Sequence, residues 1–220
     1  MKLKAVILCL SVIFGQICFG TYVKGTETSL TADEVITNIE NRYSVPGFSA
    51  RFIQESTLKA MQITDVATGK MFVKRPGMMR WEYEKPEKQI VVTDGESLWI
   101  YRPGDNQVMV GKAPEFFGTG KGATFLSDIR IIRRNFSVSI ASDKEGYVIL
   151  DLLPKQKKAD VAKIYLSISK NNYEISRIGI NNSYGDETVI DLFDSQFVTS
   201  PDSAFSFTIP KGAEVIKIDE

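Results

Sequence analysis

Residues 69–103 read GKMFVKRPGMMRWEYEKPEKQIVVTDGESLWIYRP, the part of the chain with the clearest β-strand pattern. Apolar and aromatic residues recur at every second position between turn signals, which is typical of consecutive β-strands. Asp94-Gly95 predicts a tight hairpin, because such a turn needs backbone angles that glycine adopts without strain. The stretch therefore predicts an antiparallel meander with strands at Lys70–Arg75, Met78–Glu84, Lys88–Thr93 and Ser97–Arg102.

The residues before this stretch predict one helix followed by a strand. Thr31 and Glu34 have the spacing of a capping box, in which each side chain binds a free backbone N–H at the start of a helix. Apolar residues then recur at helical spacing, and Pro46-Gly47 ends the pattern. The apolar stripe consists of Ala32, Val35, Ile36, Ile39 and Tyr43, and the strand begins with the alternation of Phe48, Ala50 and Phe52.

Residues 113–134 interrupt the series of strands. A glycine-rich run, Gly118–Gly122, is followed by apolar residues at helical spacing, so this region predicts one or two short helices in a loop. The apolar residues are Phe125, Leu126, Ile129 and Ile132. Further strands are expected at Gln107–Val110, Phe136–Ala141, Tyr147–Leu153, Lys163–Lys170, Glu174–Asn182, Glu187–Val198 and Phe205–Ile209, for a total of about twelve.

Several of these strands are apolar on both faces. Met79, Trp81 and Tyr83 share one face of their strand. In the strand at Ser97–Arg102, Leu98 and Ile100 point one way while Trp99 and Tyr101 point the other way. A sheet with one face in water should alternate clearly between apolar and polar residues, so both faces are expected to be covered. Two architectures fit: a closed barrel or sandwich with a packed interior, and a curved sheet whose concave face, roofed by helices, holds an apolar ligand.

The first twenty residues predict a secretory signal. Two lysines precede a mostly apolar run, Ala5–Ile17, and the small residue Gly20 marks the expected cleavage site. The run is shorter than the ~20 apolar residues of a membrane-spanning helix. Both cysteines lie in this segment, so the exported chain would contain no disulfide. We expect residues 21–220 to form a single domain, because no shift in composition marks a linker.

The charge and residue types exclude several functions. The chain has 27 Lys and Arg against 27 Asp and Glu, so it lacks the excess of positive charge that drives nucleic-acid binding. It has no histidine, which excludes histidine-dependent hydrolysis and histidine-ligated metals. A hydrolase that uses two carboxylates remains conceivable, but no pair of acids with suitable spacing stands out. We therefore expect a binding protein without enzymatic activity, cofactor or metal.

The block at residues 69–83 resembles the periplasmic outer-membrane lipoprotein carrier family, LolA. The resemblance continues through Pro86, Ile90–Gly95 and Leu98–Pro103, and it spans nearly all of the chain from Thr31 to Ile218. It implies a mainly β (α+β) fold: an incomplete antiparallel β-barrel of about eleven to twelve strands, with a lid of short helices over its apolar concave face. Weaker likenesses lie at Phe48–Gln54, Leu152–Pro154 and Phe205–Gly212.

The resemblance also implies a function and a site. The family carries acylated lipoproteins across the periplasm, from an inner-membrane lipoprotein-releasing ABC transporter to an outer-membrane lipoprotein receptor. The family's arginine before proline corresponds to Arg75, whose expected role is to bind the lid backbone and hold the empty carrier closed. The expected acyl-binding residues are Phe52, Val73, Met79, Trp81, Tyr83, Trp99, Tyr101, Phe125, Leu126 and Ile129.

Two alternatives stay open at this point. Trp81 and Trp99 are the leading candidates for the cavity wall, yet each could pack behind the sheet instead. A related half-barrel lipid-binding protein or envelope-stress sensor would share the fold, and a sensor is expected to carry a second domain or a membrane anchor after the barrel. We expect a periplasmic monomer that binds no nucleic acid.

Overall fold

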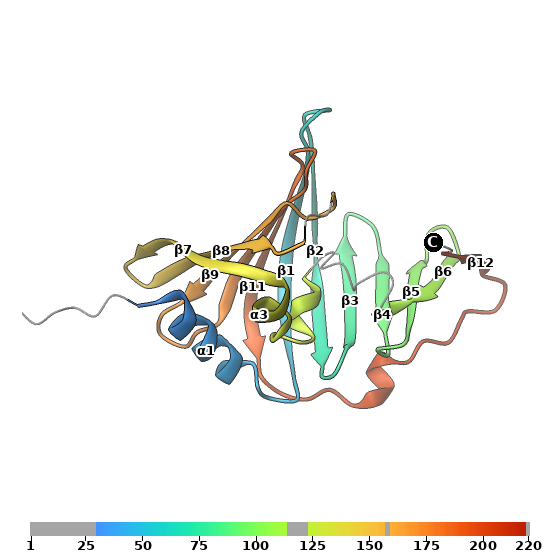
Figure 1. Cartoon of the computed structure of the whole chain (residues 1–220). Helices are drawn as coiled ribbons and strands as arrows, with labels where there is room; N and C mark the ends of the chain where they lie inside the picture. Colours follow the sequence, from blue (N-terminus) through green and yellow to red (C-terminus); the bar gives the residue numbers. More distant parts are fainter. Residues whose placement is uncertain (1–29, 114–122, 157–158, 219–220) are drawn as a thin grey trace, which may run out of the picture.

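The computed structural model describes residues 30–113, 123–156 and 159–218, which form one twelve-stranded sheet (Figure 1). The strand order is β12-β6-β5-β4-β3-β2-β1-β11-β10-β9-β8-β7, and every pair is antiparallel except β12 with β6. The strands are β1 (Gly47–Leu58), β2 (Ile63–Lys74), β3 (Met78–Lys85), β4 (Gln89–Thr93), β5 (Ser97–Arg102), β6 (Gln107–Lys112), β7 (Phe136–Lys144), β8 (Tyr147–Pro154), β9 (Lys163–Ser169), β10 (Ile175–Asn181), β11 (Glu187–Gln196) and β12 (Glu214–Lys217).

The sheet is curved and open. β7 and β12 are its two outer strands, and they do not pair with each other. The helix α1 (Ala32–Arg42), the short helix α3 (Ile131–Asn135) and the 3₁₀ turn η1 (Thr124–Leu126) all lie on the concave side (Figure 1). This arrangement confirms the incomplete barrel with short helices over its concave face. Neither a closed barrel nor a sandwich is formed.

Helix α1 begins as the sequence predicts. The Thr31 Oγ1 accepts a hydrogen bond of 3.2 Å from the Glu34 backbone N–H, and the Glu34 carboxylate accepts one of 2.8 Å from the Thr31 N–H. The hydrogen bond from the Thr31 backbone holds the pKa of Glu34 below its ordinary value. The capping box thus fixes the start of a helix that turns Val35, Ile36 and Ile39 towards the sheet.

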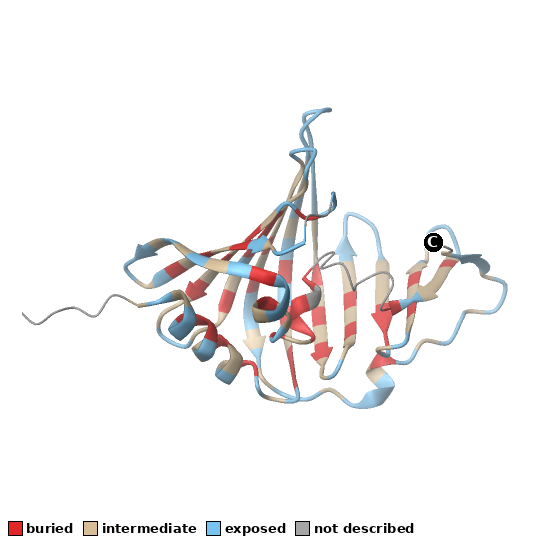
Figure 2. Cartoon of the chain, viewed as in Figure 1, coloured by how far each residue is buried: buried red, intermediate tan, exposed pale blue. Residues whose placement is uncertain are grey.

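The main hydrophobic core lies between the concave face and these helices (Figure 2). It extends across β1, β2, β3 and β7–β11 because side chains that are directly opposite in neighbouring antiparallel strands share one face. A smaller cluster, Leu98, Ile100 and Ala113, lies on β5 and just after β6. Within the described residues, no helix is long and apolar enough to cross a membrane.

The C-terminal region corrects one expectation. Residues 205–209 were expected to form a strand, but Asp202–Phe205 form the 3₁₀ turn η2 and no strand follows until β12. Residues 197–213, called the strap below, leave β11 and run beneath the sheet towards β12 (Figure 1). The Arg80 guanidinium on β3 donates a hydrogen bond of 3.3 Å to the Ala204 carbonyl of the strap. The strap then ends in β12, which pairs in parallel with β6.

The β1–β2 hairpin is longer than expected. The alternation at residues 70–75 predicts only the second half of β2, whereas the strand begins at Ile63 and pairs with β1 along its whole length. Residues 64–68 (TDVAT) do not alternate between apolar and polar side chains, so the sequence gives no strand signal for this half. The hairpin therefore extends beyond the body of the sheet (Figure 1).

Candidate functional site

An aromatic cluster lines the concave face where β1, β2 and β3 meet. The Phe52 ring lies 4.9 Å from the Trp81 ring and 5.1 Å from the Tyr83 ring, between centroids, in edge-to-face geometry. Val73 and Met79 are directly opposite each other on β2 and β3 and are fully buried beside this cluster. The structure therefore brings together five of the residues expected to bind acyl chains: Phe52, Val73, Met79, Trp81 and Tyr83.

Gly69 makes room for this cluster. A Cβ atom at Gly69 would lie 2.8 Å from Cζ of Phe52 and closer still to the Glu82 carbonyl oxygen. Both separations are far below van der Waals contact, so only glycine lets the Phe52 ring lie across β2. Gly69 is the first residue of the block that resembles the LolA family, but no pattern in the sequence indicates this packing role.

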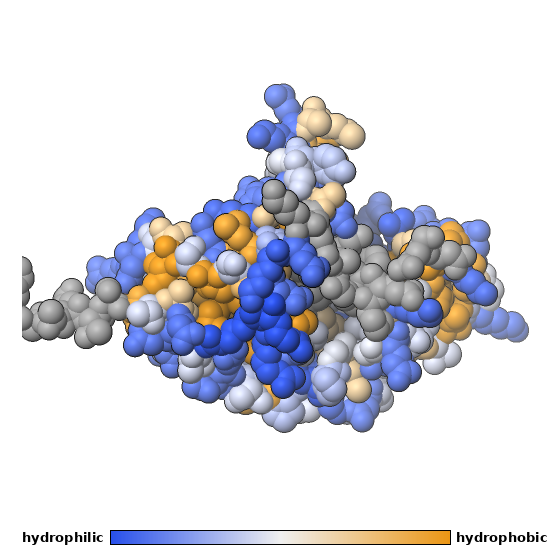
Figure 3. Space-filling view, viewed as in Figure 1, coloured by the Kyte–Doolittle hydropathy of each residue, from blue (hydrophilic) through white to orange (hydrophobic). Residues whose placement is uncertain are grey.

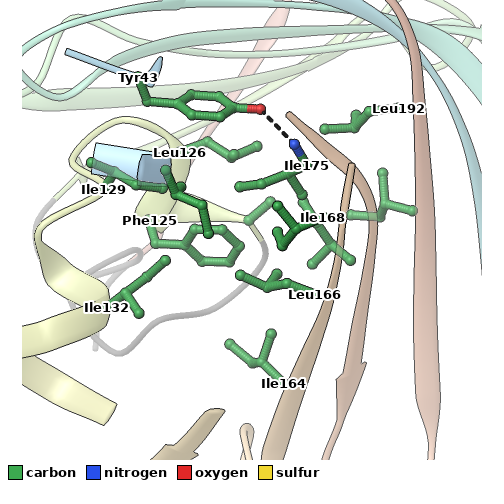
Figure 4. Packing of buried hydrophobic residues seen from close by; sticks show 14 of the residues in the cluster. Tyr43, Phe125, Leu126, Ile129, Ile132, Ile164, Leu166, Ile168, Ile175 and Leu192 are labelled. Atoms are coloured by element: carbon green, nitrogen blue, oxygen red, sulfur yellow. Dashed lines mark hydrogen bonds between the residues drawn. The ribbon is translucent and has the colours of Figure 1, made fainter. Parts of the chain in front are cut away.

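The lid, defined here as residues 123–135, fills the hollow of the sheet. Phe125, Leu126, Ile129 and Ile132 are buried and belong to the main core. Figure 4 shows them pointing towards apolar side chains of β9, β10 and β11. These partners are Ile164, Leu166, Ile168, Ile175 and Leu192. The sequence predicts the three strands that carry these partners, at residues 163–170, 174–182 and 187–198, but not that these side chains face the lid.

Tyr43 closes one end of the hollow. Its hydroxyl accepts a hydrogen bond of 3.1 Å from the Ile175 N–H (Figure 4), and burial raises the pKa of this hydroxyl. Its ring meets the Phe48 ring at 5.2 Å and the Phe197 ring at 5.3 Å. The residue therefore stays neutral and links α1 to the sheet.

Arg75 connects the lid to the rest of the molecule. Its Nη1 donates a hydrogen bond of 2.7 Å to the Val45 carbonyl, which precedes β1, and its Nη2 donates one of 3.0 Å to the Leu126 carbonyl of the lid. Burial lowers the pKa of the guanidinium, but arginine starts so high that the group stays charged at neutral pH. Charge-assisted bonds of this kind are stronger than neutral ones.

A second arginine, Arg133, anchors the other end of the lid. Arg133 donates hydrogen bonds of 2.9 and 3.0 Å to the Glu40 carboxylate and also pairs with Asp33, so the lid is bound to α1. The hydrogen bond to Asp33 and the charge of Glu40 raise the pKa of Arg133. Between α1 and the lid lies a cleft of about 660 Å³, whose lining includes Arg75, Arg133 and Asp128.

Within the lid, Asp128 binds two further arginines. Its carboxylate accepts hydrogen bonds of 2.8 Å from Arg130 Nε and 2.5 Å from Arg134 Nη2. Partial burial opposes ionisation of this carboxyl, but the hydrogen bond and charge of Arg130, with the charge of Arg134, outweigh it and hold the pKa below its usual value.

Trp99 and Tyr101 lie on the other side of the sheet. Trp81 is directly opposite Val91, and Val91 is directly opposite Ile100, so these three share the concave face. Trp99 and Tyr101 alternate with Ile100 and therefore point to the convex face. There they meet Phe207 of the strap, at 6.3 Å and 5.7 Å between ring centroids. The structure does not bring them together with the Phe52–Trp81 cluster.

The chemistry of the hollow is that of an apolar binding site. The buried polar residues in the described part of the chain are Thr93 and Ser127, and neither hydroxyl titrates near neutral pH. In the same residues no three His, Cys, Asp or Glu side chains lie together as a metal site would require. What the arrangement offers is a wide apolar surface occupied by a small lid, which is held by arginines.

Comparison with known proteins agrees with this arrangement. Residues 43–208 match the family model "Outer membrane lipoprotein carrier protein LolA". The chain is 32% identical over 170 residues to an outer-membrane lipoprotein carrier protein of Dechloromonas aromatica, covering 77% of this chain and 78% of that protein. It is 34% identical over 152 residues to the same kind of protein from Pseudomonas putida strain GB-1, covering 68% and 72%.

A solved structure shares the fold. The crystal structure of an uncharacterized conserved protein from Thermus thermophilus superposes with a TM-score of 0.56 at 15% identity, covering 84% of this chain and 98% of that one. At this identity the likeness supports the fold alone. The family model and the curated relatives carry the assignment: the chain belongs to the outer membrane lipoprotein carrier protein (LolA) family.

Proposed function

We propose that this protein is a periplasmic carrier that binds the acyl chains of lipoproteins on its concave face. One observation carries the proposal: Phe125, Leu126 and Ile129 of the lid pack against the apolar floor of the sheet, the surface to which we assign the acyl chains. A site already filled by the protein's own apolar side chains can exchange them for a ligand of the same polarity. Membership of the lipoprotein carrier family supports the same role.

The exchange explains how a carrier can both hold and release lipid. Each CH₂ group removed from water contributes about 0.8 kcal/mol, so several acyl chains in the open would be unfavourable by tens of kcal/mol. When the chains enter, the lid loses its own contacts with the sheet. When the chains leave, the lid regains them, and this gain offsets part of the free energy of release.

In this proposal Arg75 is the latch of the empty state. Its bond to the Leu126 carbonyl exists only while the lid is closed over the sheet, so it favours the empty carrier. The acyl-binding residues are then Phe52, Val73, Met79, Trp81 and Tyr83 on the floor and Phe125, Leu126 and Ile129 on the lid. Trp99 and Tyr101 contact the strap and are left out of this surface.

The proposed partners follow from the same cycle. A lipoprotein is embedded in the inner membrane by its acyl chains, so an ABC transporter must release it to the carrier. At the outer membrane, a receptor with a still more favourable apolar site accepts the chains. No step in this cycle requires the carrier to make or break a covalent bond.

Gel filtration of the protein mixed with a triacylated lipoprotein tests the proposal, with the same lipoprotein lacking its acyl chains as the control. We expect a complex with the acylated form alone. A complex with both forms would show that the polypeptide rather than the lipid is recognised. If neither form binds, even after release by membranes that contain the transporter, the carrier proposal is wrong.

A further inference from the structure

Two turns form a projection at one end of the molecule. The β1–β2 turn, residues 58–63, extends beyond the rest of the sheet, and the β10–β11 turn, residues 182–186, lies beside it (Figure 1). These two segments are called the knob below. In Figure 3 the projection stands clear of the body, so it can reach a flat surface without a clash between that surface and the rest of the protein.

The knob exposes large apolar side chains. Met61 is 67% exposed, Leu58 41% and Ile63 45%, and Tyr184 on the neighbouring turn is 75% exposed. Leu58 and Ile63 are directly opposite each other in the β1–β2 hairpin, so their side chains share one face. Apolar residues gathered at a protruding tip contribute nothing to the core, which indicates a role in contact with another surface.

The two turns of the knob are held together. The Lys59 N–H donates a hydrogen bond of 3.0 Å to the Asp186 carboxylate, and Asn182 Nδ2 donates one of 2.9 Å to the same group. The Asn182 side-chain oxygen in turn accepts hydrogen bonds of 2.9 Å from the N–H groups of Tyr184 and Asp186. The exposed side chains are thus displayed on a fixed support.

We propose that the knob inserts its apolar tip into the interfacial region of a phospholipid bilayer. A specific protein interface buries about 1,200 Å² or more, which two short turns cannot supply. A fluid bilayer needs no complementary shape, and it accepts aliphatic side chains below an interfacial tyrosine. Lys59 suits the same place, because a lysine can bury its stem while the ammonium stays in water.

The knob has no net charge, which favours apolar insertion over electrostatic attraction to the bilayer. Lys59 is its one basic residue, and the acid Asp186 offsets it. Contact therefore depends on apolar insertion rather than on attraction to anionic lipids. We expect weak, reversible binding that responds little to salt or to the fraction of anionic lipid, as suits a protein that must leave the membrane again.

A tryptophan at the tip tests the insertion directly. Met61→Trp is mixed with vesicles of phosphatidylcholine whose acyl chains carry bromine, a quencher of tryptophan fluorescence. Leu153→Trp is the matched control, because Leu153 is 50% exposed and lies on β8, outside the knob. We expect quenching that exceeds the unsubstituted protein by at least twofold for Met61→Trp and no excess for Leu153→Trp.

Vesicle flotation supplies the second measurement. Met61→Asp with Tyr184→Asp should lower the bound fraction at least fivefold, whereas Leu153→Asp should leave it unchanged. Equal quenching of both tryptophan variants, or no quenching of Met61→Trp, overturns the proposal, as does self-association through the knob without quenching. The vesicles contain no lipoprotein, so this measurement does not depend on binding of lipoprotein acyl chains. In gel filtration, the variant with both aspartate substitutions should form a complex with the acylated lipoprotein as the unsubstituted protein does.

Discussion

The two ends of the sheet are covered from opposite sides. Around β7–β11 and β1, the helices cover the concave face, while ion pairs such as Arg177–Asp191 and Lys163–Asp151 occupy the convex face. Around β4–β6, the convex face is apolar as well, with Val92 and Val108 fully buried and the strap packed against Trp99. One continuous sheet therefore has a lid on one face and a strap on the other.

The two covers differ in how they are attached. The strap is continuous with β11 at one end and with β12 at the other, so the strand pairing of the sheet anchors both of its ends. The lid continues into β7 at its C-terminal end, where Lys155 donates hydrogen bonds of 2.8 and 2.9 Å to the carbonyls of Asn135 and Arg133. Elsewhere, in the described residues, it is held by apolar packing and by the side-chain hydrogen bonds of Arg75 and Arg133. From this difference we predict that the strap stays in place when a ligand binds, whereas the lid moves.

Removing a buried side chain of the strap should have the largest effect on stability. Phe205 belongs to the strap and is only 1% exposed, so Phe205→Ala should lower the free energy of unfolding by about 3–5 kcal/mol. The concave site is untouched, so binding of an uncharged apolar fluorophore such as N-phenyl-naphthylamine should not change. Chemical denaturation and a fluorescence titration measure the two quantities.

The matched variant on the lid is Leu126→Ala. Leu126 is fully buried too, but loss of its contacts favours the open lid rather than the unfolded chain. Hydrogen exchange of the lid amides should accelerate more than tenfold, with a smaller loss of global stability than in Phe205→Ala. Equal global losses without faster local exchange would contradict the distinction between the two covers.

Two arginines that bind main-chain carbonyls allow a second comparison. Arg75→Leu removes the bond to the lid, and because one charge-assisted bond contributes about 1.5–3 kcal/mol, cargo should be held about tenfold more tightly or more. Arg80→Leu removes a bond to the strap and should leave cargo binding unchanged. The measurement is the rate of transfer to the acceptor; a latch role for Arg75 is excluded if that variant delivers cargo as fast as the unsubstituted protein.

The anchor of the lid on α1 should contribute less. The ion pairs of Arg133 are partly exposed, and such pairs contribute about 0.2–1 kcal/mol. Arg133→Met should raise the affinity for the apolar fluorophore by about two- to fivefold and weaken its dependence on salt. Arg177→Met, which breaks an ion pair on the convex face, serves as the control.

Acid should loosen the lid slightly. The pKa of Asp128 is lower in the folded protein than in the unfolded chain. Its ionised carboxylate therefore contributes fully to the stability of the fold above the ordinary pKa of aspartate, about 3.9. This contribution to stability is lost as the pH falls through the lower pKa of the folded state. Affinity for the uncharged fluorophore should thus rise modestly below about pH 4. Asp128→Asn should remove this rise; an unchanged rise would assign it to other carboxyls.

The local elements could be predicted, and the long-range packing could not. The capping box of Thr31 and Glu34 and the turn at Asp94-Gly95 act within a few residues, and both elements are where the sequence predicts them. β12 was missed because it has four residues and pairs in parallel with the distant β6. Phe205 and Phe207 alternate like a strand, but Phe205 is buried at the end of η2 and Phe207 meets the rings of Trp99 and Tyr101.

The site could be predicted only in part, because it too depends on long-range packing. Met79, Trp81 and Tyr83 share a face by alternation, and their neighbours across the strands settle that this face is concave. β5 is apolar on both faces, so alternation alone cannot say whether Trp99 or Ile100 faces the hollow. That choice depends on where the strap runs, more than a hundred residues later in the chain.

The short strand β12 has a consequence for the fate of the protein at high concentration. Without it, β6 would offer a row of free backbone N–H and C=O groups on which a strand of another copy could grow. β12 occupies that row, is only four residues long and carries a charge at each end, Glu214 and Lys217. We therefore expect this strand to limit edge-to-edge association, and a chain truncated before it should self-associate more readily.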